Sequence, residues 1–577
     1  MTDSTPSIPA EKARPWSSWR VLLSYAIPLL VLSWARPAGI DEVIVMLTGV
    51  FIGLTHWFLS PLTTSLFLLG FGQIISLANA EKMRDTGDAI LWQDLLYALP
   101  NFSGNLGTLW QYVGFSGLLA GVLGTSFLLL SRIVEQRWQK RSRPIGIAFS
   151  AAALLFYLPA THDYLVDVAA DMQLFRQSAK SFAGNLHTHS LARFLHSTTL
   201  EPAAFQLPAG NATPFTDMAA NLYVNTPAVR ADPAPDIFVI LNESQFNPSE
   251  LADCHAQDDC GMSLYEQDRS SALRGPLKVH THGWGTWNAE FTLMTGVPYF
   301  WFGESGFYSA YTTAPRVQMA LAKHLASLGY RTIGIYPTQK GMLNAALAYR
   351  RYGFQEFHGA EDLDMSWDWC KIPDRLMYQK LMEKYRSARK EDKRPIFMVM
   401  LTVFNHGPHG QGCMDSQLAK SLGNNATSQA AKFKDYLHRS KAANDAATAF
   451  RDVALALPQH VLLLFAGDHQ PSFEGLASRY PRRMHRQMPT ADALMFTSYQ
   501  FYLNYDGAAS VVSAGNLREL DISFLASTLL ELAMLPLGPL FHPNIQLREL
   551  CQGRLDSCST AIIDSYKSHL AQVGFYK

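Results

Sequence analysis

The chain has 577 residues, more than one compact core normally holds, so two or more structural units are expected. Lysine plus arginine and aspartate plus glutamate each number 48, so the chain carries no net charge. Without a basic excess a nucleic-acid partner has no electrostatic support, and none is predicted. Apolar residues are concentrated before residue 161, and the remainder has the composition of an ordinary soluble domain.

Five long hydrophobic runs occupy the first 160 residues: Val21–Trp34, Val43–Leu59, Leu62–Ala78, Thr108–Ser131 and Ile145–Ala160. Several are shorter than the ~20 apolar residues that cross a bilayer, so some helices would borrow flanking residues. A buried soluble bundle is the alternative, but five such runs exceed what a soluble core needs. The first run lacks a small-residue cleavage pattern, which favours an anchor over a cleaved signal peptide. We therefore predict a cytoplasmic N-terminus over residues 1–20 and a five-span α-helical transmembrane anchor over residues 21–160.

Basic residues predict how this anchor is oriented. Three precede the first run and five crowd the loop before the last: Lys12, Arg14, Arg20, Arg132, Arg137, Lys140, Arg141 and Arg143. The positive-inside rule places both segments in the cytoplasm. Because five spans that start inside end outside, we expect everything after residue 161 on the extracytoplasmic side.

The cysteines offer an independent test of that topology. All six lie after residue 253: Cys254, Cys260, Cys370, Cys413, Cys551 and Cys558. An even number in an exported domain predicts disulfides. Two pairs are close enough in sequence for local bridges, Cys254 with Cys260 and Cys551 with Cys558, which leaves Cys370 with Cys413. Zinc binding is the alternative, but no C-x-x-C spacing is present.

Residues 161–235 are interpreted as a juxtamembrane helix and a linker that lies on the catalytic unit. Helix-compatible sequence over Asp163–Phe182 gives way to six prolines at 202, 208, 214, 227, 233 and 235. Three histidines, His187, His189 and His196, are interpreted as surface residues of this linker and not as a metal site.

From Asp236 onward, short apolar runs alternate with helical stretches. The runs are Ile237–Leu241, Thr332–Ile335, Ile396–Leu401 and Val461–Phe465, and the clearest helices are Gln318–Leu328 and Ala442–Leu457. Strands buried on both faces and separated by helices indicate an α/β fold. The sequence thus predicts an α/β domain over residues 236–577 with a largely parallel central sheet.

Polar motifs follow three of these predicted strands: Asn242-Glu243-Ser244, Asn405-His406-Gly407-Pro408-His409 and Gly467-Asp468-His469. In open α/β sheets the site lies beyond the carboxyl ends of the strands, so these motifs are expected to converge. A fourth motif runs from Gly283 to Phe291, and its Thr286 is expected to open a helix that ends near Thr295.

These motifs carry the chemistry of a metal-activated nucleophile. A threonine hydroxyl is a weak nucleophile that needs its proton removed or its alkoxide stabilised, and a divalent metal can do both. Glu243, Asp468 and His469 offer two carboxylates and one imidazole, and Thr286 makes a fourth ligand. This mixed oxygen and nitrogen set suits Mn or Zn, with Mg as a third option.

The four motifs, in this order, resemble those of the lipoteichoic acid synthase and phosphoglycerol transferase branch of the alkaline phosphatase/sulfatase superfamily. The resemblance implies a sulfatase-like fold, a Thr286 nucleophile, a metal bound by Glu243, Thr286, Asp468 and His469, and a substrate-binding region that includes His409. It also implies that His406 contacts the phosphoryl group or protonates the leaving oxygen. The formylglycine segment of true sulfatases is missing around Thr286, which argues against sulfate ester hydrolysis.

One departure from the branch concerns the donor. The resembled enzymes place Trp-Asn-Arg, with a phosphate-binding arginine, where this chain has Leu343-Asn344-Ala345. Asn344 matches, whereas Lys340, Arg350 or Arg351 would have to supply the missing charge. Phosphoglycerol is therefore the first choice of headgroup and phosphoethanolamine the second.

The resulting hypothesis is a multi-pass enzyme of the bacterial inner (plasma) membrane with a periplasmic catalytic domain. It would transfer a phospholipid headgroup through a phospho-threonine onto a glycan or lipid-glycan of the cell envelope. A sulfatase-like phosphodiesterase that uses water as acceptor is the alternative enzyme. A catalytically inactive envelope sensor or scaffold is the alternative from another class, and the intact nucleophile and ligands argue against it.

Overall fold

The computed structural model describes residues 205, 213–222 and 232–577, except 252–253, 255–259, 367–370, 411, 414, 423–427, 473–475, 477–478, 480–492 and 506–518. The five predicted spans, the helix expected over Asp163–Phe182 and the linker histidines lie outside these residues. No helix within the described part is long and apolar enough to cross a membrane.

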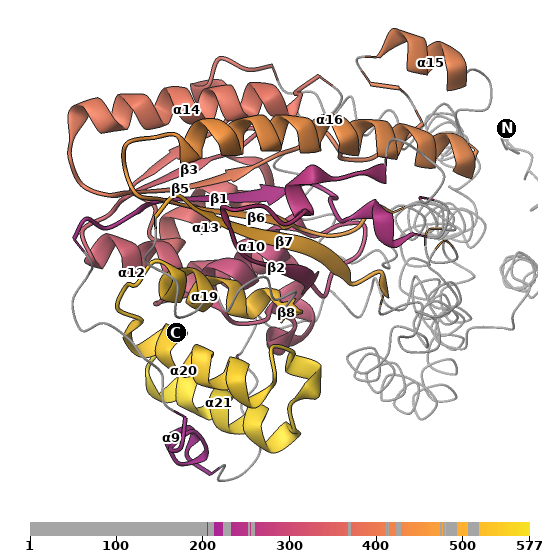
Figure 1. The fold of residues 1–577 in the computed structure, drawn as a ribbon. Helices are drawn as coiled ribbons and strands as arrows, with labels where there is room; N and C mark the ends of the chain where they lie inside the picture. Colours follow the sequence, from indigo (N-terminus) through magenta and orange to yellow (C-terminus); the bar gives the residue numbers. More distant parts are fainter. Residues whose placement is uncertain are drawn as a thin grey trace, which may run out of the picture. The chain divides into compact units, whose positions relative to one another are not determined.

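An eight-stranded sheet forms the centre of this unit, in the order β4-β3-β5-β1-β6-β7-β2-β8 (Figure 1). The strands are β1 (Asp236–Asn242), β2 (Ser271–Lys278), β3 (Arg331–Ile335), β4 (Glu356–His358), β5 (Ile396–Leu401), β6 (Val461–Gly467), β7 (Phe496–Leu503) and β8 (Leu520–Asp521). The four strands predicted from apolar runs are β1, β3, β5 and β6, so the α/β prediction is confirmed for this domain.

The sheet is largely parallel, as expected, but it is mixed. Strand β7 pairs antiparallel with both β6 and β2, whereas the other pairings are parallel. Because β2 is antiparallel to β7 and β7 is antiparallel to β6, β2 runs in the same direction as β6. The carboxyl ends of β1, β5, β6 and β2 therefore all lie at one edge of the sheet, and each is followed by one of the four motifs.

Helices cover both faces of the sheet (Figure 1). One layer holds α14 (Asp374–Glu391) and α16 (Gln429–Leu455). The other face holds α10 (Thr286–Thr295), α12 (Leu321–Ser327), α13 (Ala345–Tyr352) and α19 (Leu525–Leu532), with α20 (Gly538–Leu550) and α21 (Thr560–Gln572) beyond them. Helices α12 and α10 match the expected bounds closely, whereas α16 starts thirteen residues before the predicted Ala442.

Side chains of β1 alternate between the two cores, which is the period-two geometry of a strand. Ile237, Val239 and Leu241 join the cluster with α10 and α19, and Phe238 and Ile240 join the cluster with α14 and α16. All five are at most 1% exposed. This two-sided burial explains why the strand has an uninterrupted apolar sequence.

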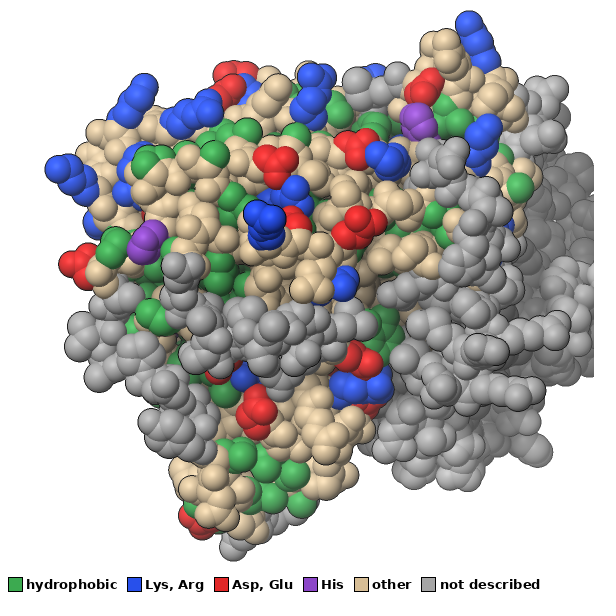
Figure 2. Space-filling view, viewed as in Figure 1, with side chains coloured by type: hydrophobic (Ala, Val, Ile, Leu, Met, Phe, Trp, Pro, Cys, Tyr) green, Lys and Arg blue, Asp and Glu red, His purple; other side chains and the backbone are tan. Residues whose placement is uncertain are grey.

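The outer surface of the α14 and α16 layer is solvated. Figure 2 shows basic and acidic side chains interspersed over it, with hydrophobic areas between them. Ion pairs such as Lys380–Glu383 and Lys441–Asp445 lie along these helices. Such exposed pairs contribute little stability.

Part of the predicted linker packs on the catalytic domain. Phe215, in the short helix α9 (Phe215–Met218), lies edge-on to Tyr566 at 5.1 Å, and the Ser565 hydroxyl donates to the Thr213 carbonyl at 2.5 Å. Phe205 contacts Phe302 with a 5.2 Å separation of ring centroids. Phe205, Thr213 and Phe215 therefore pack against residues of the catalytic domain.

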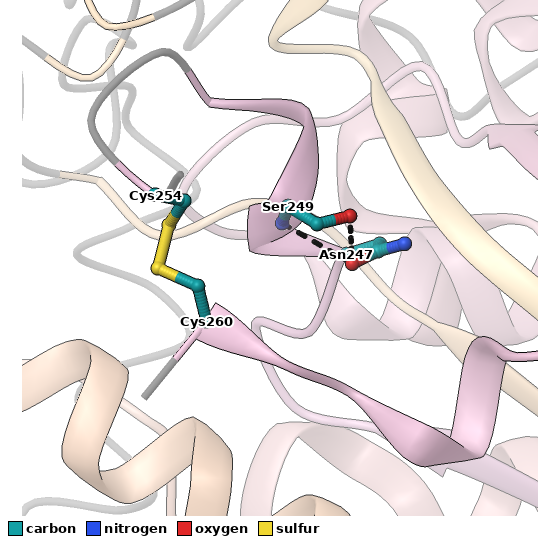
Figure 3. The surroundings of a disulfide bond; sticks show 4 residues. All are labelled: Asn247, Ser249, Cys254 and Cys260. Atoms are coloured by element: carbon teal, nitrogen blue, oxygen red, sulfur yellow. Dashed lines mark hydrogen bonds between the residues drawn. A yellow bond between two sulfur atoms is a disulfide. The ribbon is translucent and has the colours of Figure 1, made fainter. Parts of the chain in front are cut away.

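Two of the predicted disulfides are present. Cys254 is bonded to Cys260 and Cys551 to Cys558. Figure 3 shows the first bridge beside a turn in which Ser249 donates twice to the Asn247 side chain. Cys413 is also disulfide-bonded, but its expected partner Cys370 lies outside the described residues, so that pairing stays a prediction.

We expect Gly467→Ala to lower the stability of the catalytic domain. A Cβ at this last residue of β6 would lie 1.8 Å from the Gln245 carbonyl oxygen, so backbone must shift. Overpacking of this kind costs about 1–3 kcal/mol. The matched control is Gly341→Ala, where a Cβ meets no atom within 4 Å. Thermal unfolding of the two variants checks this, and equal melting temperatures would contradict the predicted clash.

Candidate active site

The parallel pairing of β1 with β6 places two acidic residues side by side. Asn242 is in register with Gly467, so the next residues, Glu243 and Asp468, leave the sheet together at its carboxyl edge. The Asp468 N–H donates to the Asn242 carbonyl at 3.2 Å, which extends the ladder by one bond. Both side chains are almost fully buried, at 5% and 0% exposed.

Hydrogen bonds fix the Asp468 carboxylate from both sides. Its Oδ1 accepts from the backbone N–H groups of Ser244 at 2.7 Å and His469 at 2.8 Å. Its Oδ2 accepts from the Thr286 hydroxyl at 2.7 Å. The Glu243 Oε1 accepts from the Ser244 hydroxyl at 2.7 Å. The structure therefore brings the predicted nucleophile onto the predicted metal-ligand pair.

His469 completes a compact set of donor atoms. Its Nδ1 lies 2.9 Å from the Gln470 carbonyl, which fixes the proton on Nδ1 and leaves a lone pair on Nε2. Nε2 is 3.3 Å from Asp468 Oδ2, 3.7 Å from Glu243 Oε1 and 3.5 Å from Thr286 Oγ1. Glu243, Asp468 and His469 each offer one donor atom, and these three atoms lie within 4.8 Å of one another. This donor set fits a divalent cation.

The electrostatics of the pair also favour a bound cation. Burial raises the pKa of Glu243 well above its ordinary value, and the neighbouring charge of Asp468 raises it further. A nearby positive charge favours the ionised form of a buried carboxyl such as Glu243. A divalent metal would supply that charge.

Thr286 is held in place by its own helix. It is the first residue of α10, after Gly285 in the left-handed conformation with φ 86°. In the same first turn, Trp287 Nε1 and Asn288 Nδ2 both donate to the Phe307 carbonyl, at 2.8 and 3.0 Å. These bonds clamp the start of α10 to the segment η6 (Tyr299–Tyr308).

The motif after β5 is held by a residue that the sequence analysis missed. Arg439, on α16, is 0% exposed and donates to the carbonyls of Phe404, His406 and Pro408 at 3.1, 2.9 and 3.1 Å. Asp435, one turn earlier, lies 3.4 Å from its guanidinium. In the sequence Arg439 stands three residues after Tyr436 and four before Ala443, both buried, and this place on the inward stripe of the helix is the signal that could have identified it.

The two histidines of this motif are neutral. Burial lowers the pKa of His406 to about 4, although its ring contacts the Gly407 carbonyl, and the charges of His469 and Arg439 lower it further. Burial also lowers the pKa of His409 well below its ordinary value, and its Nε2 lies 3.0 Å from the Asn405 carbonyl.

The residues that were predicted to bind the headgroup lie in different parts of the domain. Asn344 Nδ2 donates to the Ala310 carbonyl at 2.9 Å, at the start of α13, whereas Lys340 pairs with Asp362 at 2.9 Å. Arg350 and Arg351 are exposed on the last turn of α13. After that turn the Gly353 carbonyl accepts from Thr332, near the amino end of β3.

The structure therefore does not bring Arg350 and Arg351 to the cluster. Helix α13 runs antiparallel to β3, so its end lies at the sheet edge opposite the metal-ligand residues. Their suggested role in replacing the arginine absent at Ala345 finds no support in this geometry. Lys340 is likewise engaged with a carboxylate of its own.

A further buried acid, Glu290, lies one turn after Thr286 in α10. Glu290 is 4% exposed and accepts a hydrogen bond from the Tyr349 hydroxyl at 2.5 Å. Burial raises the pKa of Glu290 to about 8, and the charge of Asp468 adds to the increase. The protonated acid thus joins α10 to α13.

This group predicts a pH dependence of stability. Because the pKa of Glu290 rises from 4.5 in the unfolded chain to about 8 in the folded one, the folded protein binds more protons between these values. The free energy of unfolding should therefore fall as pH rises through this window, by up to about 1.4 kcal/mol per pH unit. Glu290→Gln should remove that contribution, whereas Glu383→Gln on exposed α14 should not. Denaturant unfolding over the pH range checks this, and an unchanged profile in Glu290→Gln would refute it.

Two curated relatives match the chain. An uncharacterized protein of Haemophilus influenzae is 28% identical over 348 residues, covering 59% of this chain and 61% of the relative. A putative cyclic beta-1,2-glucan modification protein of Rhizobium meliloti is 22% identical over 244 residues, covering 41% of this chain and 36% of the relative. The chain thus spans less than two thirds of the length of each.

Solved structures of similar fold include two transferases. The Streptococcus pyogenes phosphoglycerol transferase GacH, in complex with sn-glycerol-1-phosphate, is 17% identical with a TM-score of 0.44, covering 63% of this chain and 94% of that one. The Neisseria meningitidis lipooligosaccharide phosphoethanolamine transferase EptA is 12% identical with a TM-score of 0.49, covering 90% and 95%.

The comparison with protein families is the most direct of the three. The sulfatase family model matches residues 235–533, which is more than half of the chain and contains all four motifs. The matched region also contains the sheet from β1 to β8 and the whole Glu243–Asp468–His469 cluster. The chain belongs to the sulfatase family.

Proposed function

We propose that this protein is a membrane-anchored, metal-dependent phosphotransferase that moves a phospholipid headgroup onto an envelope glycan or lipid-glycan. One observation carries the proposal. The Thr286 hydroxyl, at the start of a helix, donates to Asp468 Oδ2 at 2.7 Å and lies 3.5 Å from His469 Nε2. That arrangement places a potential nucleophile on the donor atoms that would hold a cation.

In this proposal Glu243, Asp468, His469 and Thr286 would hold the divalent ion, which when bound would supply positive charge beside the nucleophile and the phosphoryl group. Asp468 holds the hydroxyl of Thr286 in one orientation through its Oδ2. The two N–H bonds to Oδ1 keep that carboxylate from rotating. Mn or Zn suits the mixed donor set, with Mg as the third option.

The reaction would proceed in two displacements. Thr286 Oγ1 gives up its proton and bonds to phosphorus, the bond from phosphorus to the diacylglycerol oxygen breaks, and that oxygen takes up a proton. An acceptor hydroxyl then loses its proton and bonds to phosphorus as the bond to Thr286 breaks, and Thr286 Oγ1 takes up a proton, which regenerates the threonine. Burial opposes a charged His406, so contact with the phosphoryl group fits it better than the role of acid.

Three observations support a transferase acting on a lipid donor. The apolar runs of the first 160 residues would hold the site at the membrane where such donors are found. The disulfides fit an exported catalytic domain, on the periplasmic side of a bacterial inner membrane. The Rhizobium meliloti relative is named a putative glucan modification protein, which is consistent with a glycan acceptor.

Thr286→Ala should abolish the covalent intermediate. Loss of a nucleophile lowers turnover by several orders of magnitude, whereas Thr286→Ser keeps a hydroxyl and should retain a phosphorylated residue. Mass spectrometry of the protein after incubation with phosphatidylglycerol and phosphatidylethanolamine would locate the adduct. Turnover by Thr286→Ala near that of the wild type would rule out double displacement. Release of the headgroup phosphate into water without an acceptor product would favour the hydrolase alternative.

Asp468→Asn should lower the metal content of the purified protein. The substitution removes one charged ligand oxygen from a three-residue cluster, so affinity for the ion should fall sharply. Asp445→Asn, on the exposed side of α16, is the matched control. Elemental analysis of both variants provides the measurement, and a full complement of metal in Asp468→Asn would show that the ligands are assigned wrongly.

A further inference from the structure

A buried acceptor atom in the loop before the nucleophile is not used by the proposed mechanism. His282 lies four residues before Thr286, where it forms a parallel bridge with Gln470. Its Nε2 is buried and has no hydrogen-bond partner. Buried polar atoms in native proteins almost always have partners, so an exception of this kind beside an active site suggests a ligand atom.

The protonation state of the His282 ring determines whether the ligand atom donates or accepts a hydrogen bond. Burial lowers the pKa of His282 to about 4, and the charge of His469 lowers it further, although a hydrogen bond to the Pro471 backbone acts in the opposite sense. The ring is therefore neutral, with its proton on Nδ1 toward Pro471 and a lone pair on Nε2. A neutral imidazole nitrogen of this kind accepts a hydrogen bond, so the ligand atom is a donor.

An aromatic corner adjoins the same loop; it consists of Trp284, Trp287, Phe307 and Tyr308. Trp284 is nearly parallel to Phe307, with centroids 6.1 Å apart at 10°, and Trp287 is nearly parallel to Tyr308, at 6.3 Å and 18°. The two tryptophans meet edge to face at 5.3 Å and 69°. Trp284, Trp287 and Phe307 are partly exposed, and the two tryptophans stand on either side of Thr286 in the sequence.

We propose that His282 and the aromatic corner bind the ethanolammonium group of the donor lipid, and so select phosphatidylethanolamine over phosphatidylglycerol. This inference rests on the proposed function, because it assigns the headgroup that Thr286 would receive. It reverses the order of preference drawn from the sequence, in which phosphoglycerol came first.

The chemistry of the headgroup matches both features. An ammonium carries only hydrogen-bond donors, which suits the bare Nε2 of His282. Its charge is attracted to the faces of tryptophan and tyrosine rings, and tryptophan is the strongest of these partners. Four covalent bonds separate the phosphorus from this nitrogen, so the ammonium must lie near whichever residue is phosphorylated. The two tryptophans flank Thr286 in sequence, within two residues on either side.

A glycerol headgroup would make fewer favourable contacts with His282 and the aromatic corner. Its hydroxyl groups can donate to His282, but they carry no charge and gain no cation–π attraction. The difference between the two lipids should therefore depend on the aromatic corner, whereas binding of the phosphate should not. Removal of a ring should change the preference between donors and leave the first displacement itself intact.

The experiment measures formation of the phosphorylated Thr286 by the full-length protein in detergent as a function of lipid concentration. Phosphatidylethanolamine and phosphatidylglycerol are tested separately, without acceptor, on the wild type and on Trp284→Leu, Trp284→Phe and His282→Leu. We expect Trp284→Leu to raise the KM for phosphatidylethanolamine about two- to thirtyfold, the range of one cation–π contact. Trp284→Phe, which keeps a π face, should restore part of the loss. His282→Leu should also raise this KM, and the KM for phosphatidylglycerol should change little throughout.

Equal changes for both lipids, or no change for phosphatidylethanolamine, would overturn the inference while leaving the transferase in place. So would a wild type that forms only the phosphoglycerol adduct. A wild type that forms no adduct from either lipid would instead show that the proposed function has failed, and this inference with it. If Trp284→Leu does not fold, Trp284→Phe and His282→Asn provide the same comparison with smaller expected changes.

Discussion

The carboxylate of Asp468 is the contact on which the rest of the site depends. Its two oxygens meet three different segments: the turn after β1 through the Ser244 N–H, its own loop through the His469 N–H, and α10 through the Thr286 hydroxyl. These three contacts are possible because β1 and β6 are in register up to Asn242 and Gly467, and because Gly467 leaves room for the Gln245 backbone. A buried acid with fixed hydrogen bonds is a preorganised group, so little rearrangement would accompany the chemistry.

Helix α16 provides the second support, from the opposite face of the sheet. Tyr436 donates to the Ser244 carbonyl at 2.9 Å, and Arg439 holds the loop after β5 by three carbonyls. One helix therefore fixes the turn that carries Glu243 and the loop that carries His406. The charge of Arg439 also lies close enough to lower the pKa of Glu243, though less than burial raises it.

Much of this arrangement could be predicted from the sequence because it depends on local patterns. Continuous apolar runs predicted β1, β3, β5 and β6, and the rule that sites lie beyond the carboxyl ends of strands predicted that Glu243 and Asp468 would meet. Strand β2, the antiparallel β7 and the short β4 and β8 were not predicted, since the residues of these strands do not form continuous apolar runs and are explained only by their neighbours in the sheet. Arg439 was missed for a similar reason: its role comes from carbonyls far away in sequence. The expectation for Arg350 and Arg351 found no support because counting residues along a helix does not reveal which edge of the sheet its end reaches.

The reversed strand β7 has a consequence for how such sites diversify. Strand β7 lies between β6, which leads to Asp468 and His469, and β2, which leads to Thr286. Strands β6 and β2 are therefore separated by roughly 10 Å. The chain crosses that gap on the loop around His282, whose bridge to Gln470 ties it to the ligand-bearing segment. Asp468 and His469 therefore stand on one support and Thr286 on another. Substitutions in the loop before Thr286 can change the surroundings of the nucleophile while β6 and the residues that follow it keep their own place in the sheet, and one fold can acquire new substrates by changing a single loop.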